Sequence, residues 1–298
     1  MNLPHLQWET QRVFLAVLRT GSLSAAARAL GIAQATARRR IDVLERSVGM
    51  SLFVRSPAGL LPTDTARQLI KHAESMALAA EAFSRAASAQ ANDLSGTVRV
   101  TSSELLGVEV LPSMLREIRD AEPQLTLELS VSNRLEDLAL QEADVAVRIR
   151  RPTEAAVVAR HVGDLRIGLY ATQELLARYG HPRTADALEK CPLIGPDRNL
   201  IETAFLEQKG FFPTQERPSI RTDHHLAQFA ALRAGLGIGV CSSQLARRYG
   251  LVRVLHEQVD FRVDIWIAMH HDLRRVKRIA LVFDSLAESL ARFLQDAE

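Results

Sequence analysis

Cysteines, aromatic residues and long apolar runs are all scarce in this chain, and the scarcity excludes several classes of protein. Of 298 residues only two are cysteines, far apart and outside any CxxC or Cys/His cluster, so neither a disulfide framework nor a zinc finger is expected. No apolar run approaches the roughly 20 residues that span a bilayer, and the N-terminal segment lacks the apolar core of a secretory signal. We therefore expect a cytoplasmic protein in a reducing compartment, with no membrane partner.

Sequence motifs of catalysis and of cofactor binding are missing as well. The chain has no GxSxG, HExxH or P-loop pattern, and the glycines of residues 235–239 lack the GxGxxG spacing of a dinucleotide site. The histidine pairs at residues 224–225 and 270–271 are adjacent in sequence, so their side chains point in different directions. We expect a protein that is not an enzyme and that holds no cofactor and no metal.

Formal charge is distributed unevenly along the chain. Residues 1–62 contain eight arginines and three acidic residues, a formal charge of +5, and since the whole chain carries +2 the remainder carries −3. A small basic segment on a mildly acidic body is expected where only that segment meets a polyanion such as DNA. The length also allows two or three compact domains.

Three short helices are predicted at the start of the chain. Apolar residues recur at helical spacing over residues 8–20, Gly21 follows as a stop, and residues 24–30 form a second, alanine-rich helix. After a turn at residues 31–33, a third helix covers residues 34–48. This order predicts a helix-turn-helix inside a three-helix core.

A small hairpin, interpreted as a wing, is predicted at residues 51–61, because these residues alternate around a Pro-Ala-Gly turn. Gln at the start of a recognition helix can pair with adenine and Arg with guanine. The candidates for base readout are therefore Gln34, Ala35, Thr36, Arg38 and Arg39. Arg40 completes a run of three arginines that cannot all face one groove wall, so at least one should reach phosphate or solvent. Ser22 and Ser24 cap the second helix, and their hydroxyls also suit a phosphate contact.

Residues 63–91 contain no glycine or proline and predict one long helix. Its apolar residues follow a 3,4 repeat typical of a coiled-coil partner surface. We expect this seam to form a dimer, although a helix that packs on its own domain would show the same pattern. The seam residues are Ala66, Leu69, Ala73, Met76, Ala80, Phe83 and Ala87.

Over residues 97–149, short β-rich runs alternate with helices, which predicts a mainly parallel sheet covered by helices, and a second set of strands and helices follows. The predicted strands are 97–101, 125–131, 144–149, 157–161, 166–170, a strand near 193 and 264–269. The predicted helices are 105–121, 134–142, 173–178, 201–209, 225–234 and 275–295.

Hydroxyl groups gather where the first of these strands gives way to a helix. At this point Ser102 and Ser103 could hold a carboxylate or another small anion, and simple N-capping is the alternative. Weaker candidates for the same site follow a strand or precede a helix: Arg148, Thr222, Asp223 and His224.

The chain resembles the LysR-type transcriptional regulator family over essentially its whole length. The densest match is FLAVLRTGSLSAAARAL at residues 14–30, and EADVAV at 142–147 and AGLGIG at 234–239 match further on. Single matching residues are Gln34, Ile41, Leu44, Glu45, Gly49, Leu52, Phe53, Arg55, Thr63, Gly96, Trp266, His270, Leu273 and Arg274.

The resemblance implies a fold and a domain order. It implies a winged helix-turn-helix DNA-binding domain at residues 1–62, a linker helix for dimerisation at 63–92 and a two-subdomain α/β effector domain at 93–298, similar to periplasmic binding proteins. Subdomain I would comprise about 93–162 and 267–298, and subdomain II about 163–266.

The resemblance also implies a function. The protein would be a sequence-specific transcriptional regulator whose binding to a double-stranded promoter with interrupted dyad symmetry is modulated by a small-molecule effector. It would form a dimer or tetramer, and an activator would contact RNA polymerase. Arg55 would contact phosphate from the wing, with a structural salt bridge as the alternative.

Some residues depart from the family pattern, and two other functions fit part of the sequence. The family usually has Ser at position 33, Pro or Ser at 35, Val at 37 and Ser at 38. This chain has Ala33, Ala35, Ala37 and Arg38 there, so an operator sequence cannot be carried over. Outside this helix, Thr65-Ala66 replaces the common Ala-Gly and Cys241-Ser242 the frequent Leu-Pro. The alternatives are a solute-binding or enzymatic α/β protein with a dimerising helical head, and a nonspecific chromatin-like DNA binder. Only a DNA binder should lose affinity steeply as salt rises.

Overall fold

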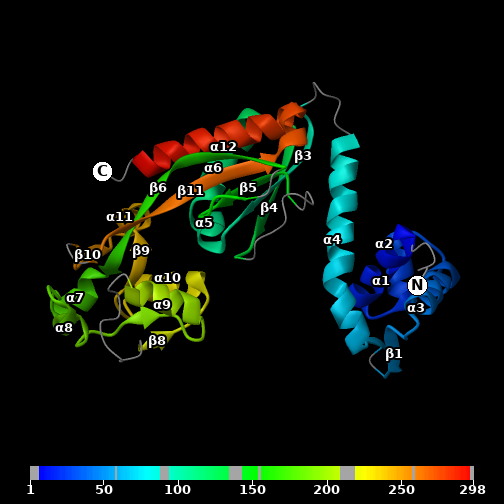
Figure 1. Cartoon of the computed structure of the whole chain (residues 1–298), viewed down its shortest axis with the longest axis horizontal. Coiled ribbons are helices and arrows are strands. Elements are labelled where there is room, and N and C mark those ends of the chain that lie inside the picture. Colours follow the sequence, from blue (N-terminus) through cyan, green and yellow to red (C-terminus); the bar gives the residue numbers. More distant parts are fainter. Residues whose placement is uncertain are drawn as a thin grey trace. The chain divides into compact units, whose positions relative to one another are not determined.

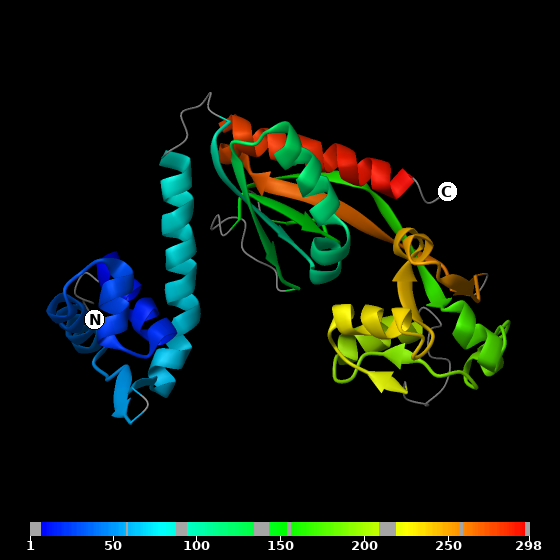
Figure 2. The ribbon, with the colours of Figure 1, turned by 180° about the vertical axis from the view of Figure 1, so that it is seen from behind.

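The structure, a computed structural model, describes residues 7–57, 59–87, 94–133, 143–153, 156–208, 219–256 and 259–295. It contains two compact units, one formed by the described residues up to 87 and the other by the described residues from 94 onward. The long helix therefore belongs to the same unit as the predicted DNA-binding residues, and Figures 1 and 2 show both units. None of the described helices is long and apolar enough to cross a membrane.

The N-terminal unit has the predicted helix-turn-helix with a wing. Its elements are α1 (Trp8–Thr20), α2 (Leu23–Leu30), α3 (Gln34–Val48), β1 (Phe53–Ser56), β2 (Gly59–Pro62) and α4 (Asp64–Ala87). Its core consists of small and aliphatic side chains around one aromatic ring, as the helical spacing predicted. The buried members are Val13, Phe14, Leu15, Val17, Ala26, Ala27, Ala37, Ile41, Leu44, Leu52, Ala66 and Ala73.

Two sets of contacts fix the wing to the helices. One carboxylate oxygen of Glu45, in α3, accepts hydrogen bonds from the backbone N–H groups of Leu52 (2.6 Å) and Phe53 (3.3 Å). On the other strand, the N–H of Leu60 donates to the carbonyl oxygen of Gly21 at 2.8 Å. A Cβ atom at Gly59 would lie 2.6 Å from that same oxygen, and the φ angle of Gly59 is +115°, so both the space and the backbone require glycine here.

The C-terminal unit is built on one large mixed sheet. Among the described residues, seven strands join in the order β10-β6-β11-β5-β3-β4, with β9 also paired to β6. The strands of this unit are β3 (Gly96–Ser102), β4 (Leu125–Val131), β5 (Val145–Arg148), β6 (Val157–Ala171), β7 (Ile194–Gly195), β8 (Ile220–Arg221), β9 (Gly239–Ser242), β10 (Val252–Val254) and β11 (Phe261–His270). Its helices are α5 (Glu104–Glu109), α6 (Leu111–Ala121), α7 (Gln173–Tyr179), α8 (Ala185–Leu188), α9 (Leu200–Gln208), α10 (His225–Arg233), α11 (Ser243–Arg248) and α12 (Lys277–Gln295), with a 3-10 turn at His271–Arg275.

The large sheet is mixed, and the parallel pairing predicted from residues 97–149 is confirmed for β3, β4 and β5. Only β3 pairs in parallel within the large sheet, with β4 and β5, whereas every pairing of β6 and β11 is antiparallel. The strand-helix-strand alternation correctly predicted the parallel first part. It could not reveal that β11, close to the end of the chain, inserts between β5 and β6.

Some predicted elements merge or divide in the structure. Residues 105–121 form α5 and α6 rather than one helix, because the chain changes direction at Val110 and α6 restarts with Pro112 in its first turn. The strands predicted at 157–161 and 166–170 are the single strand β6. The helix predicted at residues 134–142 lies outside the described residues.

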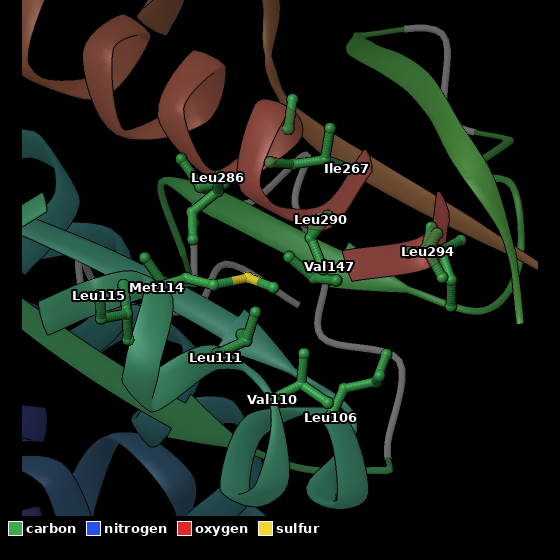
Figure 3. Packing of buried hydrophobic residues seen from close by; sticks show 14 of the residues in the cluster. Leu106, Val110, Leu111, Met114, Leu115, Val147, Ile267, Leu286, Leu290 and Leu294 are labelled. Atoms are coloured by element: carbon green, nitrogen blue, oxygen red, sulfur yellow. The ribbon is translucent and has the colours of Figure 1, made fainter. Parts of the chain in front are cut away.

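Two helices, α6 and α12, cover one face of the large sheet and form its main core. Figure 3 shows Leu111 and Met114 of α6 directed toward the same interior as Leu286 and Leu290 of α12, with Val147 of β5 in that layer. All five side chains are at most 5% exposed. Burial on this scale supplies the main stabilisation of the unit.

Strands β6 and β11 run side by side along most of their length and connect the part of the unit around α6 with the part around α9 and α10 (Figure 1). Their pairing shifts register between Ile265 and Trp266, opposite Gly163, whose φ angle is +137°. The expected subdomain boundary at residues 162–163 and 266–267 falls at this shift, and the division into subdomains stays a prediction.

Candidate nucleic-acid interface and effector region

The recognition helix α3 buries one face and exposes the other. Ala37, Ile41 and Leu44 are at most 5% exposed and anchor the helix in the core. The five residues assigned to base readout, Gln34, Ala35, Thr36, Arg38 and Arg39, are all exposed. A helix with this surface offers amide, hydroxyl and guanidinium groups to the base edges and phosphates of a major groove.

The three consecutive arginines have different surroundings. Nη1 of Arg40 lies 2.9 Å from a carboxylate oxygen of Glu9 in α1. This ion pair holds α3 against α1, and a contact of the partly exposed Arg40 with DNA stays a prediction. Arg38 and Arg39 are exposed and form no ion pair with any residue that the structure describes. Two of the three charges are therefore available to DNA.

The serines at the start of α2 form a small hydrogen-bonded cap. The hydroxyl of Ser22 accepts from the N–H of Ala25 at 3.4 Å, and the hydroxyls of Ser22 and Ser24 are 2.9 Å apart. Ser22 is thus the predicted N-cap, and both side chains remain partly exposed. A phosphate contact from either hydroxyl stays a prediction.

Arg55 lies on the exposed edge of the wing, in β1 opposite Leu60. Within the described part of the chain it has no ion-pair partner, so the structural salt bridge considered from the sequence is not formed there. The neighbouring cross-strand pair Val54 and Leu61 is about half exposed, at 50% and 47%. The wing therefore presents one positive charge beside an apolar surface.

Three of the seven residues of the predicted dimerisation seam are used within the protomer. Ala66 and Ala73 of α4 are buried in the core of the N-terminal unit, and Leu69 packs against the same core. These three residues follow the alternative that the sequence left open, a helix packed on its own domain. Met76 and Phe83 are 41% and 75% exposed and Ala80 is partly buried, whereas the side chain of Ala87 lies outside the described structure.

Ser102 and Ser103 occupy very different positions at the end of β3. The hydroxyl of Ser102 is fully buried and has no hydrogen-bond partner in the described structure. Ser103 is the partly exposed N-cap of α5, and its hydroxyl makes no capping bond. The N–H of Glu104, the first helical residue, donates to Oδ1 of Asn133 at 3.1 Å. Of the two, only Ser103 has a hydroxyl that an incoming molecule can reach directly.

Arg148, predicted to point into a cleft, is buried at 9% exposure. One of its guanidinium nitrogens donates to the hydroxyl of Thr101 at 2.8 Å, and another donates to the carbonyl oxygen of Val147 at 3.2 Å. The bond to Thr101 connects β5 to β3, whereas the bond to Val147 stays within β5. Arg148 therefore supports the sheet beneath the end of β3, and a contact with an effector stays a prediction.

The three residues before α10 also differ in role. Oδ1 of Asp223 accepts hydrogen bonds from the backbone N–H groups of Asp197 (2.8 Å), Arg198 (3.0 Å) and Asn199 (3.1 Å), which lower the pKa of this carboxyl group. Its carboxylate organises the turn before α9, and a ligand contact of Asp223 stays a prediction. The hydroxyl of Thr222 accepts from the N–H of His224 at 3.2 Å.

His224 meets the start of α5 through an acidic residue that sequence reasoning missed. Its Nδ1 lies 3.6 Å from a carboxylate oxygen of Glu104, and the imidazole is 56% exposed. The contact brings together two of the predicted regions, around Ser103 and around His224. No sequence signal pointed to Glu104, since its role depends on the approach of α10.

A second missed contact group surrounds the other end of α5. The carboxylate of Glu109 accepts a hydrogen bond from the hydroxyl of Tyr249 at 2.6 Å and lies 3.8 Å from the guanidinium of Arg233. Arg248 donates to the carbonyl oxygen of Glu109. Contacts from α10 and from the end of α11 therefore hold α5 at both ends. These contacts would have to break if α5 moved away from α10 and α11.

These observations define a class of protein. The N-terminal unit is a winged helix-turn-helix with an exposed basic recognition helix, and the C-terminal unit is a mixed α/β domain with polar contacts around α5. This is the architecture of a DNA-binding regulator with a separate ligand domain. The comparisons agree on both parts. The lysR family of bacterial regulatory helix-turn-helix proteins matches residues 8–67, and the LysR substrate binding domain matches residues 91–291.

The chain belongs to the LysR family of transcriptional regulators. Members of this family are DNA-binding regulators with an effector-binding domain and are not enzymes. The chain is 33% identical to the Mau operon transcriptional activator of Paracoccus denitrificans over 164 residues, which cover 55% of this chain and 58% of that protein. It is 25% identical to the regulator CrgA of Neisseria meningitidis over 296 residues, covering 96% and 98% of the two chains.

The fold is also found among solved structures. The full-length virulence activator AphB of Vibrio cholerae superposes with a TM-score of 0.59 at 20% identity, covering 95% of this chain and 99% of that one. At this identity the likeness concerns the fold alone. The Mau activator match spans little more than half of that protein, so its partners and target are not transferred to this chain.

Proposed function

We propose that the protein binds a promoter with interrupted dyad symmetry, as a dimer or tetramer, and that a small-molecule effector changes this binding. The observation that carries the proposal is the pair Arg38 and Arg39, exposed beside Gln34 and Thr36 on a helix whose opposite face is buried. Two such helices in a symmetric dimer would read two half-sites about one helical turn apart, or a multiple of it. RNA polymerase becomes a further partner if the protein activates transcription.

Dimerisation is proposed through the outer part of α4. Phe83 is 75% exposed, and a large exposed aromatic side chain on a long helix favours contact with a second copy. Met76 lies on the same helix, seven residues or about two turns earlier, and is also exposed. The buried residues Ala66 and Ala73 take no part in this contact.

The effector is proposed to bind where the start of α5 meets the start of α10. Ser103, Thr222 and His224 are the proposed contacts, and a small anion is the proposed class of ligand. In the present structure Glu104 supplies a carboxylate 3.6 Å from His224. An anionic effector would take the place of this carboxylate, separate α5 from α10 and shift the protein between two arrangements.

Footprinting on the DNA upstream of the gene, over a salt series and against random competitor, tests the DNA-binding proposal. A protected stretch with interrupted dyad symmetry that survives competitor is expected. Log affinity should fall linearly with log salt as phosphate contacts release counterions. Equal protection of random and upstream DNA would favour a nonspecific binder, and no protection of any genomic fragment would favour a solute-binding protein.

Arginine variants test the placement of the recognition helix. Arg39→Ala should weaken operator binding by roughly 1–3 kcal/mol, and adding Arg38→Ala should weaken it further. Arg119→Ala is the matched control, because Arg119 is an exposed arginine of α6 with its own partner, Asp120. If both recognition-helix variants bound as tightly as the control, the assignment of α3 would be wrong.

Substitutions at the effector region test the ligand proposal. Ser103→Ala and His224→Ala are expected to leave basal operator binding unchanged and to reduce the response of the footprint to a panel of small carboxylates. Glu202→Gln is the control, since Glu202 bonds the neighbouring His225 at 3.3 Å without reaching α5. A full response in both test variants would remove these residues from the site.

A further inference from the structure

One histidine and two aspartates come together on the exposed surface of the β6–β11 pair. Nε2 of His161 lies 3.1 Å from Oδ1 of Asp164 and 3.5 Å from Oδ1 of Asp264. All three atoms are within 4.8 Å of one another. The side chains are 42%, 29% and 60% exposed in that order, so an ion in solution can reach them.

The register shift creates this cluster. In a regular strand residues three apart face opposite sides, so His161 and Asp164 would be separated. Here His161 pairs with Trp266 while Gly163 pairs with Ile265, and residue 162 is the extra residue of a bulge. The bulge places both side chains on one face, where Asp164 is directly opposite Asp264.

The cluster has the donors and spacing of a metal site. Imidazole nitrogen together with carboxylate oxygen suits zinc, nickel or cobalt, and water can complete the coordination. Ligands at about 2.0–2.1 Å in a tetrahedron are about 3.3 Å apart, close to the two separations of 3.1 and 3.5 Å measured from His161. A guanidinium nitrogen of Arg262 lies 3.8 Å from the other oxygen of Asp164 and leaves Oδ1 directed at the histidine.

A second cluster in the chain lacks this arrangement. His270, His271 and Asp272 also approach one another, but Nδ1 of His270 accepts a hydrogen bond from the N–H of Asp272, and Nδ1 of His271 is 2.9 Å from the carbonyl oxygen of Ala156. The nitrogen of His270 nearest Asp272 is therefore already occupied, which leaves this cluster one imidazole, that of His271, and one carboxylate, 3.2 Å apart. This second cluster provides a matched control.

We propose that His161, Asp164 and Asp264 bind one divalent cation of the zinc, nickel and cobalt class per chain. This site is independent of the proposed DNA and effector contacts. The bound cation would join β6 to β11 where the two strands pass from one half of the C-terminal unit to the other. No metal site was expected from the sequence, because only the strand pairing brings these residues together.

Titration of the tag-free, chelator-treated full-length protein with Ni²⁺ tests the proposal. The chain has two tryptophans, and the ring of Trp266 is 5.0 Å from that of His161, so bound Ni²⁺ should quench its fluorescence. Trp8→Phe removes the other signal. Saturable quenching at one ion per chain, confirmed by calorimetry, is expected, together with a rise in melting temperature.

Variants decide whether the ion binds at this cluster. His161→Ala and Asp264→Asn should each weaken Ni²⁺ binding about tenfold or more, and His271→Ala should leave it unchanged. Asp264 is 60% exposed and asparagine has nearly the same shape, so the Asp264→Asn variant should keep the fold of the protein. Circular dichroism checks this. Binding that is absent up to about 1 mM, unchanged in both variants, or lost in His271→Ala would overturn the proposal.

Discussion

Replacing Glu45 with alanine should loosen the wing without removing any side chain proposed to face DNA. Its carboxylate oxygen is the acceptor for the N–H groups of Leu52 and Phe53, at 2.6 and 3.3 Å. Leu52 is fully buried, so its N–H would be left with poor access to water. The first strand of the wing begins at Phe53, so the same loss should change where the wing lies.

The size of the effect follows from the two bonds. A hydrogen bond to a charged group contributes about 1.5–3 kcal/mol. The second bond to Glu45 is long and the side chain is partly exposed, so water should compensate for some of the loss. We expect the N-terminal unit to lose about 2 kcal/mol, and at about 1–1.5 kcal/mol per molar urea this lowers the unfolding midpoint by about 1.5 M. Glu45→Gln keeps an acceptor and should lose about half as much.

Urea unfolding followed by the fluorescence of Trp8, in a Trp266→Phe background, measures this change in the unit that contains α1. Asp42→Ala is the control, because it removes an exposed acidic side chain from the same helix and changes the charge equally. Operator affinity is measured in parallel and should fall more for Glu45→Ala than for the control. Equal urea midpoints for Glu45→Ala and Asp42→Ala would refute the role of Glu45 in holding the wing to α3.

Three other structural features also give testable expectations. Gly59→Ala should weaken operator binding in a gel-shift assay, since its Cβ would lie 2.6 Å from the carbonyl oxygen of Gly21; unchanged affinity would contradict the close approach. Asp260 has its pKa lowered to about 2, chiefly by a hydrogen bond from Arg166, so it contributes stability that is full above about pH 4 and lost as the pH falls through about 2. In Asp260→Asn, the free energy of unfolding should lack this part of its pH dependence. A plot of that free energy against pH that runs parallel to wild type would exclude the contribution of Asp260. Phe83→Ser should shift light-scattering mass toward the monomer, and an unchanged mass would exclude the outer face of α4 as the dimer contact.

The sequence predicted the N-terminal unit well because its elements depend on local signals. Helical spacing and the stop at Gly21 give α1, Ser22 gives the cap of α2, and the Pro-Ala-Gly turn gives the wing. The C-terminal sheet was predicted less well because its order depends on pairing between distant residues. The sequence predicted two strands, one on either side of Gly163, where the structure has the single strand β6. The bulge interrupts the alternation of side chains within this strand.

The exposure of the residues proposed to face DNA was predictable from the sequence for the same reason. Exposure on a helix follows from its period, so burying Ala37 and Ile41 necessarily turns Arg38 and Arg39 outward. Pairing does not follow from the period. The ion pair of Arg40 with Glu9 requires α1 to lie against α3, and only the tertiary structure provides that contact.

The effector region shows why polar residues at strand and helix ends are ambiguous from sequence. Such positions combine free backbone groups with short polar side chains, and the same combination builds a ligand site or closes a loop. Asp223 closes the loop before α9, and Arg148 bonds Thr101 within the sheet. Because these side chains already have partners, a ligand would gain little from them. Of the residues predicted for the effector site, Ser103, Thr222 and His224 keep accessible polar groups, so the proposed effector would be recognised by these three side chains once Glu104 moves away.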